Sequence, residues 1–119
     1  MPDAEDEPVL PLAELRERGM AAVQVGTTRV LLVAVDGVDG EARAYDNRCP
    51  HRAWPLERGT LVGGVLTCAN HGWSFDVATG RCVDPGERDL VPHRCRVDDE
   101  GMVRVSLDLD LARGRTLGT

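Results

Sequence analysis

Four residues, grouped in two short pairs, constrain this chain more than any other feature. Cys49 and His51 form a Cys-x-His pair, and Cys68 and His71 form a Cys-x-x-His pair further along the chain. Each pair follows a short strand-like run, so two loops at one end of a β-fold would bring the four side chains to one point. Cysteine and histidine are the residues that bind zinc and iron–sulfur groups in proteins. The sequence therefore predicts a four-ligand metal site.

Three interpretations of these pairs compete. In the first they are a coincidence, because a free cysteine is commonly just a small buried apolar residue. In the second they hold a structural zinc, although zinc sites usually pair like with like, as in C-x₂₋₄-C and H-x₃₋₅-H. In the third they hold a Rieske [2Fe–2S] centre, in which two cysteines bind one iron and two histidines bind the other. Two mixed pairs favour the third interpretation, since each loop then supplies one ligand to each iron. A zinc-stabilised binding module without a redox role is the alternative of a different class.

At these residues the sequence resembles the Rieske ferredoxins of bacterial multicomponent oxygenases. The resemblance runs from about residue 10 to residue 107. The residues that carry it are Cys49-Pro50-His51-Arg52, Pro55-Leu56, Cys68, His71-Gly72-Trp73 and Phe75-Asp76. Gly59 and residues 63–68 are most similar to the ferredoxins of toluene and alkene monooxygenases, whose terminal oxygenase is a di-iron enzyme. Ferredoxins of ring-hydroxylating dioxygenases are the alternative within the family.

The resemblance implies one [2Fe–2S] cluster of the Rieske type. Cys49 and Cys68 would bind its inner iron, and His51 and His71 its outer iron. The chain would carry single electrons from a flavin-dependent NAD(P)H reductase to a terminal oxygenase (hydroxylase) in aromatic hydrocarbon catabolism. It would not itself be an enzyme, because the sequence has no catalytic motif and its 119 residues leave no room for a second catalytic domain.

Two positions beside the second pair bear on the redox potential. Where Rieske proteins of respiratory complexes have a serine and a tyrosine, whose hydroxyl groups donate hydrogen bonds to sulfur, this chain has Trp73 and Phe75. Such donors stabilise the reduced cluster and raise its potential. The resemblance therefore implies a low-potential cluster. Residues 83–86 match a third loop that covers the cluster in these proteins.

Short β-branched runs separated by turn residues predict a small all-β sandwich or barrel with a two-loop cluster-binding subdomain. One short helix is expected at residues 12–18, and hairpin turns are expected at residues 78–80 and 98–101. Residues 1–9 are expected to be an acidic flexible N-terminus, residues 10–108 the Rieske domain and residues 109–119 a flexible tail. The expected strands are residues 21–25, 29–35, 42–45, 65–67, 73–77, 81–83, 94–97 and 102–107.

The net charge of −6 argues against nucleic acid or an anionic membrane as a partner. This charge lies in residues 1–19 and 97–119, whereas residues 20–96 carry nine acidic residues and nine arginines. The longest apolar run, residues 30–35, is far too short to span a membrane. The acidic N-terminus lacks the features of a signal peptide. We therefore expect a cytoplasmic protein that is a monomer when free.

The remaining cysteines and the third histidine are expected to have structural roles. Cys82 and Cys95 lie in strand-like segments and should be reduced packing residues, with Cys95 facing the core. His93 follows a proline near the start of a strand and is expected on the surface. Partner contact is expected at the edge formed by the following residues: His51, Arg52, Trp54 and His71.

Overall fold

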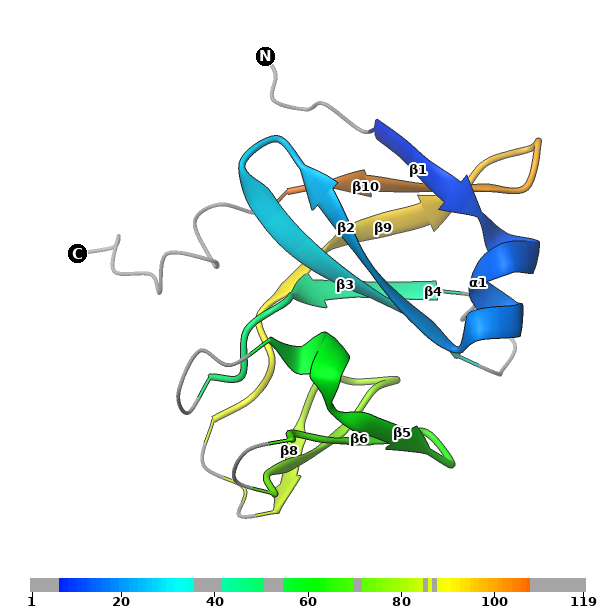
Figure 1. The fold of residues 1–119 in the computed structure, drawn as a ribbon. Coiled ribbons are helices and arrows are strands. Elements are labelled where there is room, and N and C mark those ends of the chain that lie inside the picture. The colour runs from blue at the N-terminus through cyan, green and yellow to red at the C-terminus, as the bar shows by residue number, and fades with distance from the viewer. Residues whose placement is uncertain are drawn as a thin grey trace.

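The described residues form two antiparallel β-sheets (Figure 1). The computed structural model describes residues 7–35, 42–50, 55–69, 72–84, 86 and 88–107. The large sheet has the strand order β1-β10-β9-β4-β3-β2, and the small sheet has the order β5-β6-β7-β8. The strands of the large sheet are β1 (Glu7–Pro11), β2 (Met20–Val25), β3 (Thr28–Ala34), β4 (Ala42–Asp46), β9 (Pro92–Val97) and β10 (Met102–Ser106). The other elements are α1 (Leu12–Arg18), η1 (Leu56–Arg58), β5 (Thr60–Val62), β6 (Val65–Thr67), β7 (Ser74–Asp76) and β8 (Cys82–Asp84).

The small sheet is inserted between two neighbouring strands of the large sheet. β4 and β9 pair with each other, Ala44 lying opposite His93 and Tyr45 opposite Pro92, although the whole small sheet separates them along the chain. The large sheet curls, so that its two edge strands, β1 and β2, contact each other. This arrangement confirms the expected small all-β fold with a separate two-loop subdomain.

The apolar run that begins at Val30 forms β3, which is buried on both faces. Side chains alternate along a strand, so Leu31 and Val33 enter one apolar cluster while Val30 and Leu32 enter another. The first core consists of Leu31, Val33, Val35, Tyr45, Cys49, Leu56, Leu66, Cys68, Phe75, Val77, Cys82 and Leu90. The second core consists of Leu10, Leu12, Leu15, Ala21, Val25, Val30, Leu32, Ala42, Ala44, Val103 and Val105. The first core joins the small sheet to the large one, and the second lies within the large sheet and α1.

The expected helix and hairpin turns are confirmed. α1 buries Leu12 and Leu15, and it ends where the N–H of Gly19, at a φ of +83°, donates to the Leu15 carbonyl at 2.7 Å. No helix within the described residues is long and apolar enough to cross a membrane.

In the β9–β10 turn the Asp98 carboxylate accepts the backbone N–H of Met102 at 2.9 Å. This hydrogen bond is the main cause of a lowered pKa at Asp98.

The N-terminal segment differs from the prediction of a flexible stretch over residues 1–9. Glu7–Pro11 forms the edge strand β1, which pairs antiparallel with β10 and buries Leu10. Pro8 and Pro11 lack a backbone N–H, which an edge strand tolerates because one of its sides has no neighbour. The prediction is therefore wrong for residues 7–9. Residues 1–6 and the predicted tail, residues 109–119, lie outside the described residues.

Candidate metal centre

The first predicted ligand pair belongs to the connection that leads from β4 into the small sheet, and the second belongs to the connection between β6 and β7 within that sheet. Cys49 follows β4, and Cys68 comes directly after β6. His51 and His71 lie outside the described residues, as do Arg52 and Trp54. Within the described residues, no three His, Cys, Asp or Glu side chains gather into a group that could hold a metal ion. The structure therefore describes two of the four predicted ligands.

Cys49 and Cys68 are both buried in the first apolar core. Cys49 is 1% exposed and Cys68 is 2% exposed, and both belong to the first core. None of the four cysteines, all of which lie in the described part of the chain, forms a disulfide. A thiolate is costly in apolar surroundings unless a positive charge lies beside it, and a bound metal supplies that charge. A pair of buried thiols contributed by two loops is therefore a donor set that fits the inner iron of a [2Fe–2S] centre.

The second loop is closed by its own backbone. The N–H of Cys68 donates to the Trp73 carbonyl at 2.7 Å, and the N–H of Gly72 donates to the Cys68 carbonyl at 3.2 Å. Gly72 has a φ of +74°, a conformation that glycine adopts without strain. The tight turn returns the chain directly into β7. It thereby fixes both ends of the segment that contains His71.

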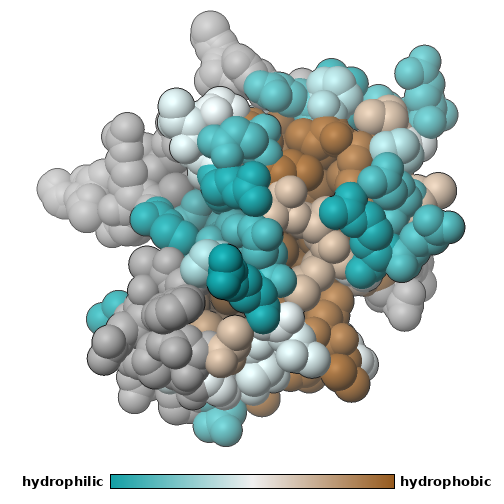
Figure 2. All heavy atoms as spheres, viewed as in Figure 1, coloured by the Kyte–Doolittle hydropathy of each residue, from teal (hydrophilic) through white to brown (hydrophobic). Residues whose placement is uncertain are grey.

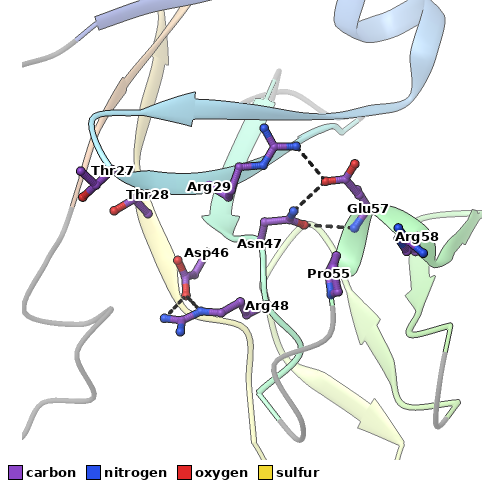
Figure 3. Close-up of a pocket in the computed structure, with 9 residues that line it drawn as sticks. All are labelled: Thr27, Thr28, Arg29, Asp46, Asn47, Arg48, Pro55, Glu57 and Arg58. Carbon is purple, nitrogen blue, oxygen red and sulfur yellow. Dashed lines mark hydrogen bonds and ion pairs between the residues drawn. The ribbon is translucent and has the colours of Figure 1, made fainter.

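The first loop is braced across its base by polar side chains (Figure 3). The Asn47 side-chain amide donates to Glu57 Oε1 at 2.9 Å, and the Glu57 backbone N–H donates to Asn47 Oδ1 at 3.0 Å. Arg29 of β3 also pairs with Glu57 Oε1, at 3.1 Å. Asn47 precedes Cys49 and Glu57 lies in η1 after the loop, so the brace holds the two ends of the loop together. The sequence did not predict a role for Asn47, Glu57 or Arg29 at this site.

A close backbone contact joins the two loops. Gly59, at the end of η1, lies against the residue that precedes Cys68: a β-carbon at position 59 would be 2.2 Å from the Thr67 carbonyl oxygen. Only a glycine permits this approach, since a β-carbon needs about 3.5–4.0 Å. The chain leaving the first predicted ligand pair therefore passes directly beside the second.

Asp46, at the end of β4, is a buried carboxylate that lies beside one arginine and one histidine. Arg48 Nη2 lies 2.9 Å from Asp46 Oδ2, and His93 Nε2 lies 3.8 Å from Asp46 Oδ1. Burial disfavours the charged form of Asp46, but the interactions with His93 and Arg48 outweigh it and lower the pKa of this carboxyl. His93 is itself buried, so the prediction of a surface histidine is wrong. Its side chain lies on the inward face of β9, on the same side as Cys95.

Residues after β8 form a third loop that reaches the first. The Cys82 N–H donates to Asp89 Oδ1 at 2.8 Å, and the Gly86 N–H donates to Cys82 Sγ at 3.3 Å. From this loop Arg88 Nη1 donates to the Pro50 carbonyl at 3.3 Å. Pro50 stands between Cys49 and His51. Arg88 therefore joins this part of the chain to the residue between the first two predicted ligands, whereas a loop over the cluster at residues 83–86 stays a prediction.

The two remaining cysteines lie in different cores. Cys82 is buried in the first core, beside the predicted ligands in the same cluster. Cys95 is partly buried against the second core, and burial raises its pKa to about 11, partly opposed by Arg43. Cys95 is thus a neutral thiol at pH 7. Both positions agree with the predicted packing role.

Comparison with known proteins shows which family the sequence of this chain matches. Residues 6–97 match the Rieske [2Fe-2S] domain family. The 4beta-methylsterol monooxygenase of Methylococcus capsulatus is 51% identical over 45 residues, which are 38% of this chain and 12% of that protein. The alignments with the first three curated relatives cover only 9 to 12% of their lengths. This chain therefore corresponds to a small part of those proteins.

Two solved structures from the carbazole 1,9a-dioxygenase system have the same fold. A chain in the complex of reduced oxygenase and oxidised ferredoxin superposes with a TM-score of 0.69 and 27% identity, over 83% of this chain and 90% of that chain. The ferredoxin of carbazole 1,9a-dioxygenase from Nocardioides aromaticivorans IC177 superposes with a TM-score of 0.73 and 22% identity. That superposition covers 88% of this chain and 100% of the ferredoxin, and at this identity it shows the fold alone.

Proposed function

The chain belongs to the Rieske [2Fe–2S] domain family and carries one cluster of that type, and we propose that it is an electron-transfer protein serving a terminal oxygenase. The observation that carries this proposal is the burial of Cys49 and Cys68, neither of them in a disulfide, in one apolar core at the bases of two neighbouring loops. When bound, a [2Fe–2S] cluster takes up and gives back one electron at a time.

The proposed ligands are Cys49 and Cys68 for the inner iron and His51 and His71 for the outer iron. The core position of the two cysteines supports their assignment to the more buried iron. Leu66 and Phe75, which are fully buried in the same core, would keep water away from the cysteine sulfurs. The histidine assignment is supported by the sequence pairs alone.

The side chains around Cys68 favour a low redox potential. Phe75 is fully buried and offers no hydrogen-bond donor, and Trp73 packs beside it with ring centroids 6.5 Å apart. The two nearby hydroxyl groups, Thr67 Oγ1 and Ser74 Oγ, lie 3.4 Å apart and bond to each other. Donors to sulfur raise the potential of such a cluster. We therefore expect a midpoint toward the low end of the roughly −150 to +300 mV range of Rieske centres.

The proposed partners are a flavin-dependent NAD(P)H reductase as electron donor and a terminal oxygenase as electron acceptor. Similarity to a chain in the oxygenase–ferredoxin complex of carbazole 1,9a-dioxygenase supports an oxygenase acceptor, and favours the ring-hydroxylating dioxygenase class. The resemblance at Gly59 and residues 63–68 favours a di-iron monooxygenase instead. The reductase is proposed from the family resemblance alone.

The first experiment determines the metal content and the ligands of the purified protein. We expect two irons and two acid-labile sulfides per chain, and no cluster in Cys49→Ser, Cys68→Ser, His51→Ala or His71→Ala. Cys95→Ser is the matched control and should keep both irons, because Cys95 lies against the second core. A colourless protein with one zinc would overturn the proposal.

The second experiment measures electron transfer in both directions. The protein is reduced by a flavin reductase with NADH or NADPH, and its reoxidation by a di-iron monooxygenase and by a ring-hydroxylating dioxygenase is followed by visible absorbance. Catalytic reoxidation by one of the two classes identifies the acceptor. A reduced protein that neither oxygenase reoxidises would contradict an electron-transfer role toward oxygenases.

A further inference from the structure

We propose that a basic groove beside the first loop is the docking site for an acidic segment of the electron-accepting protein. The groove has a volume of about 620 Å³ and lies between the β2–β3 turn, the end of β4 and η1. Three arginines, Arg29, Arg48 and Arg58, line it together with Asp46 and Glu57 (Figure 3). The proposal rests on the proposed electron-transfer function and adds to it a surface and the chemistry of the partner.

The two carboxylates of the groove are already engaged, although only Asp46 is buried and the Glu57 side chain is 38% exposed. Asp46 is buried and already paired with Arg48, and Glu57 already accepts hydrogen bonds from Arg29 and Asn47. The side chains of Arg29 and Arg48 are 51% and 57% exposed, so their guanidinium groups remain accessible from solvent. Within the described part of the chain, Arg58 is exposed and has no carboxylate within ion-pair distance. Three guanidinium groups against two engaged carboxylates leave the groove with a net positive charge.

This local positive charge contrasts with the net charge of the whole chain, which is −6. A local basic groove orients an approaching partner because it attracts carboxylates, whereas the acidic ends of the chain, residues 1–19 and 97–119, repel them. Hydrophilic side chains gather to the left of the centre of this view, beside apolar ones that run down its middle (Figure 2). The contact would therefore be polar and governed by charge, as suits a transient redox complex with a small interface.

The groove lies at the base of the loop that begins at Cys49, the first predicted ligand. Arg48 directly precedes Cys49, and η1 begins directly after Pro55, at the end of the first loop. A segment bound in the groove would thus lie against the base of the loop that holds the first predicted ligand pair. Docking there would bring the partner to the cluster end of the molecule.

The chemistry of the groove favours a short acidic protein segment. A guanidinium group pairs with a carboxylate through two parallel hydrogen bonds, and this fits side chains of aspartate or glutamate. A long polyanion such as nucleic acid would extend beyond the groove onto a chain of net charge −6, which would repel it. An apolar partner would have to remove water from three guanidinium groups without replacing their hydrogen bonds.

The absence of lysine from the sequence permits a direct test of this occupant. Arg58→Lys keeps the charge and places an amine in the groove that a carbodiimide can join to a carboxylate in contact with it. The probe is an acetylated hexaglutamate peptide, with the adduct located by mass spectrometry. Arg16→Lys, on the exposed face of α1, is the matched control.

We expect at least about fivefold more adduct at position 58 than at position 16 at low salt, with the difference vanishing as salt screens the charges. Equal yields, or a yield at position 58 that salt does not lower, would overturn the docking site. This result does not depend on the cluster or on electron transfer, so it separates a failure of the groove from a failure of the proposed function.

A second variant links the groove to the electron acceptor. Arg58→Glu should slow reoxidation of the reduced protein by its acceptor oxygenase on the order of fivefold at low salt, and less at high salt. Reoxidation by a small neutral quinone should not change, because it needs no docking site. A wild-type rate with the acceptor oxygenase would show that the acidic segment belongs to another protein and would overturn the proposed partner.

Discussion

Substitution of Gly59 by alanine tests how closely the two ligand loops are joined. Gly59 has a φ of −80°, which any residue can adopt, so its backbone conformation alone does not require glycine. A β-carbon there would lie 2.2 Å from the Thr67 carbonyl oxygen and 3.1 Å from the Thr67 carbonyl carbon. Ordinary contact needs about 3.5–4.0 Å, so the two backbone segments would have to move apart by more than about 1 Å.

The expected cost follows from this displacement. Overpacking of a well-packed site costs about 1–3 kcal/mol, and the upper part of that range applies because the obstacle is backbone and cannot rotate away. With an unfolding entropy of about 2.1 cal/mol/K per residue, a chain of 119 residues loses about 4 °C of Tm per kcal/mol. We therefore expect Gly59→Ala to lower Tm by about 8–12 °C. Its iron content should also fall, because Thr67 is bonded directly to Cys68.

Circular dichroism and a colorimetric iron assay on the purified holoprotein measure these two quantities. Gly63→Ala is the matched control, because its β-carbon would meet no atom within 4 Å. That variant bears only the cost of a left-handed alanine at a φ of +59°, about 1–2 kcal/mol, and should keep its full iron content. A Gly59→Ala protein with the wild-type Tm and iron content would refute the argument.

Three further substitutions test the surroundings of the site. Tyr45→Phe removes a buried hydrogen bond of 2.7 Å to the Val77 carbonyl and should lower the free energy of unfolding by about 1–2 kcal/mol; an unchanged denaturation midpoint would contradict this. The pKa of Asp46 is lowered on folding. Its contribution to the free energy of unfolding is therefore complete above the unfolded pKa of about 3.9, and it is lost as the pH falls through the folded pKa. Asp46→Asn should therefore flatten the acid limb of the stability profile between about pH 5 and pH 2, and an unaltered limb would show that Asp46 is not its source. Cys82→Ser should keep its iron while Cys68→Ser loses it, and loss from Cys82→Ser would mean that the ligands are wrongly assigned.

The strands were predictable where a single local pattern decides the structure. The β-branched run of β3 and the turn residues of the β9–β10 hairpin act over a few neighbours, so the sequence shows them directly. β1 was not predictable in this way, because Pro8 and several acidic residues hide a strand that exists only through pairing with β10. Edge strands tolerate such residues, and their partner lies far away in the sequence.

The buried position of His93 follows from a pattern that is present in the sequence. Arg94 and Arg96 point outward, and this alternation correctly placed Cys95 toward the interior. Applied one step further, the same alternation places His93 inward, where the structure finds it. The proline before it suggested a surface turn and outweighed the alternation.

Residue types and spacing alone predict the metal site, whereas its supporting contacts could not be predicted from them. Asn47 and Glu57 are ten residues apart across a loop, and Gly59 is required by a carbonyl of β6. Neither relation follows a helical or strand period, so no local pattern reveals it. The roles of His51 and His71 as ligands remain predictions, since the described residues do not include them.

The separation of the two cores predicts how the protein responds when its cluster is removed. The first core contains Cys49 and Cys68 and joins the small sheet, whose strands have only three residues each, to the large sheet. The second core contains no predicted ligand and is built from the large sheet and α1. Metal binding contributes folding free energy to the segments that supply the ligands. Loss of the cluster should therefore destabilise the small sheet and leave the large sheet folded.

Amide hydrogen exchange on holoprotein and apoprotein, the latter prepared by anaerobic reduction and chelation, measures this difference. The paired residues Leu66 and Phe75 of the small sheet should exchange at least tenfold faster in the apoprotein, equivalent to about 1.4 kcal/mol of local stability. Leu32 and Val103, fully buried in the second core, should keep their protection. Restoring iron and sulfide should restore slow exchange in the small sheet. Faster exchange spread equally over both sheets would contradict the argument, because it would show that the two cores unfold as one unit.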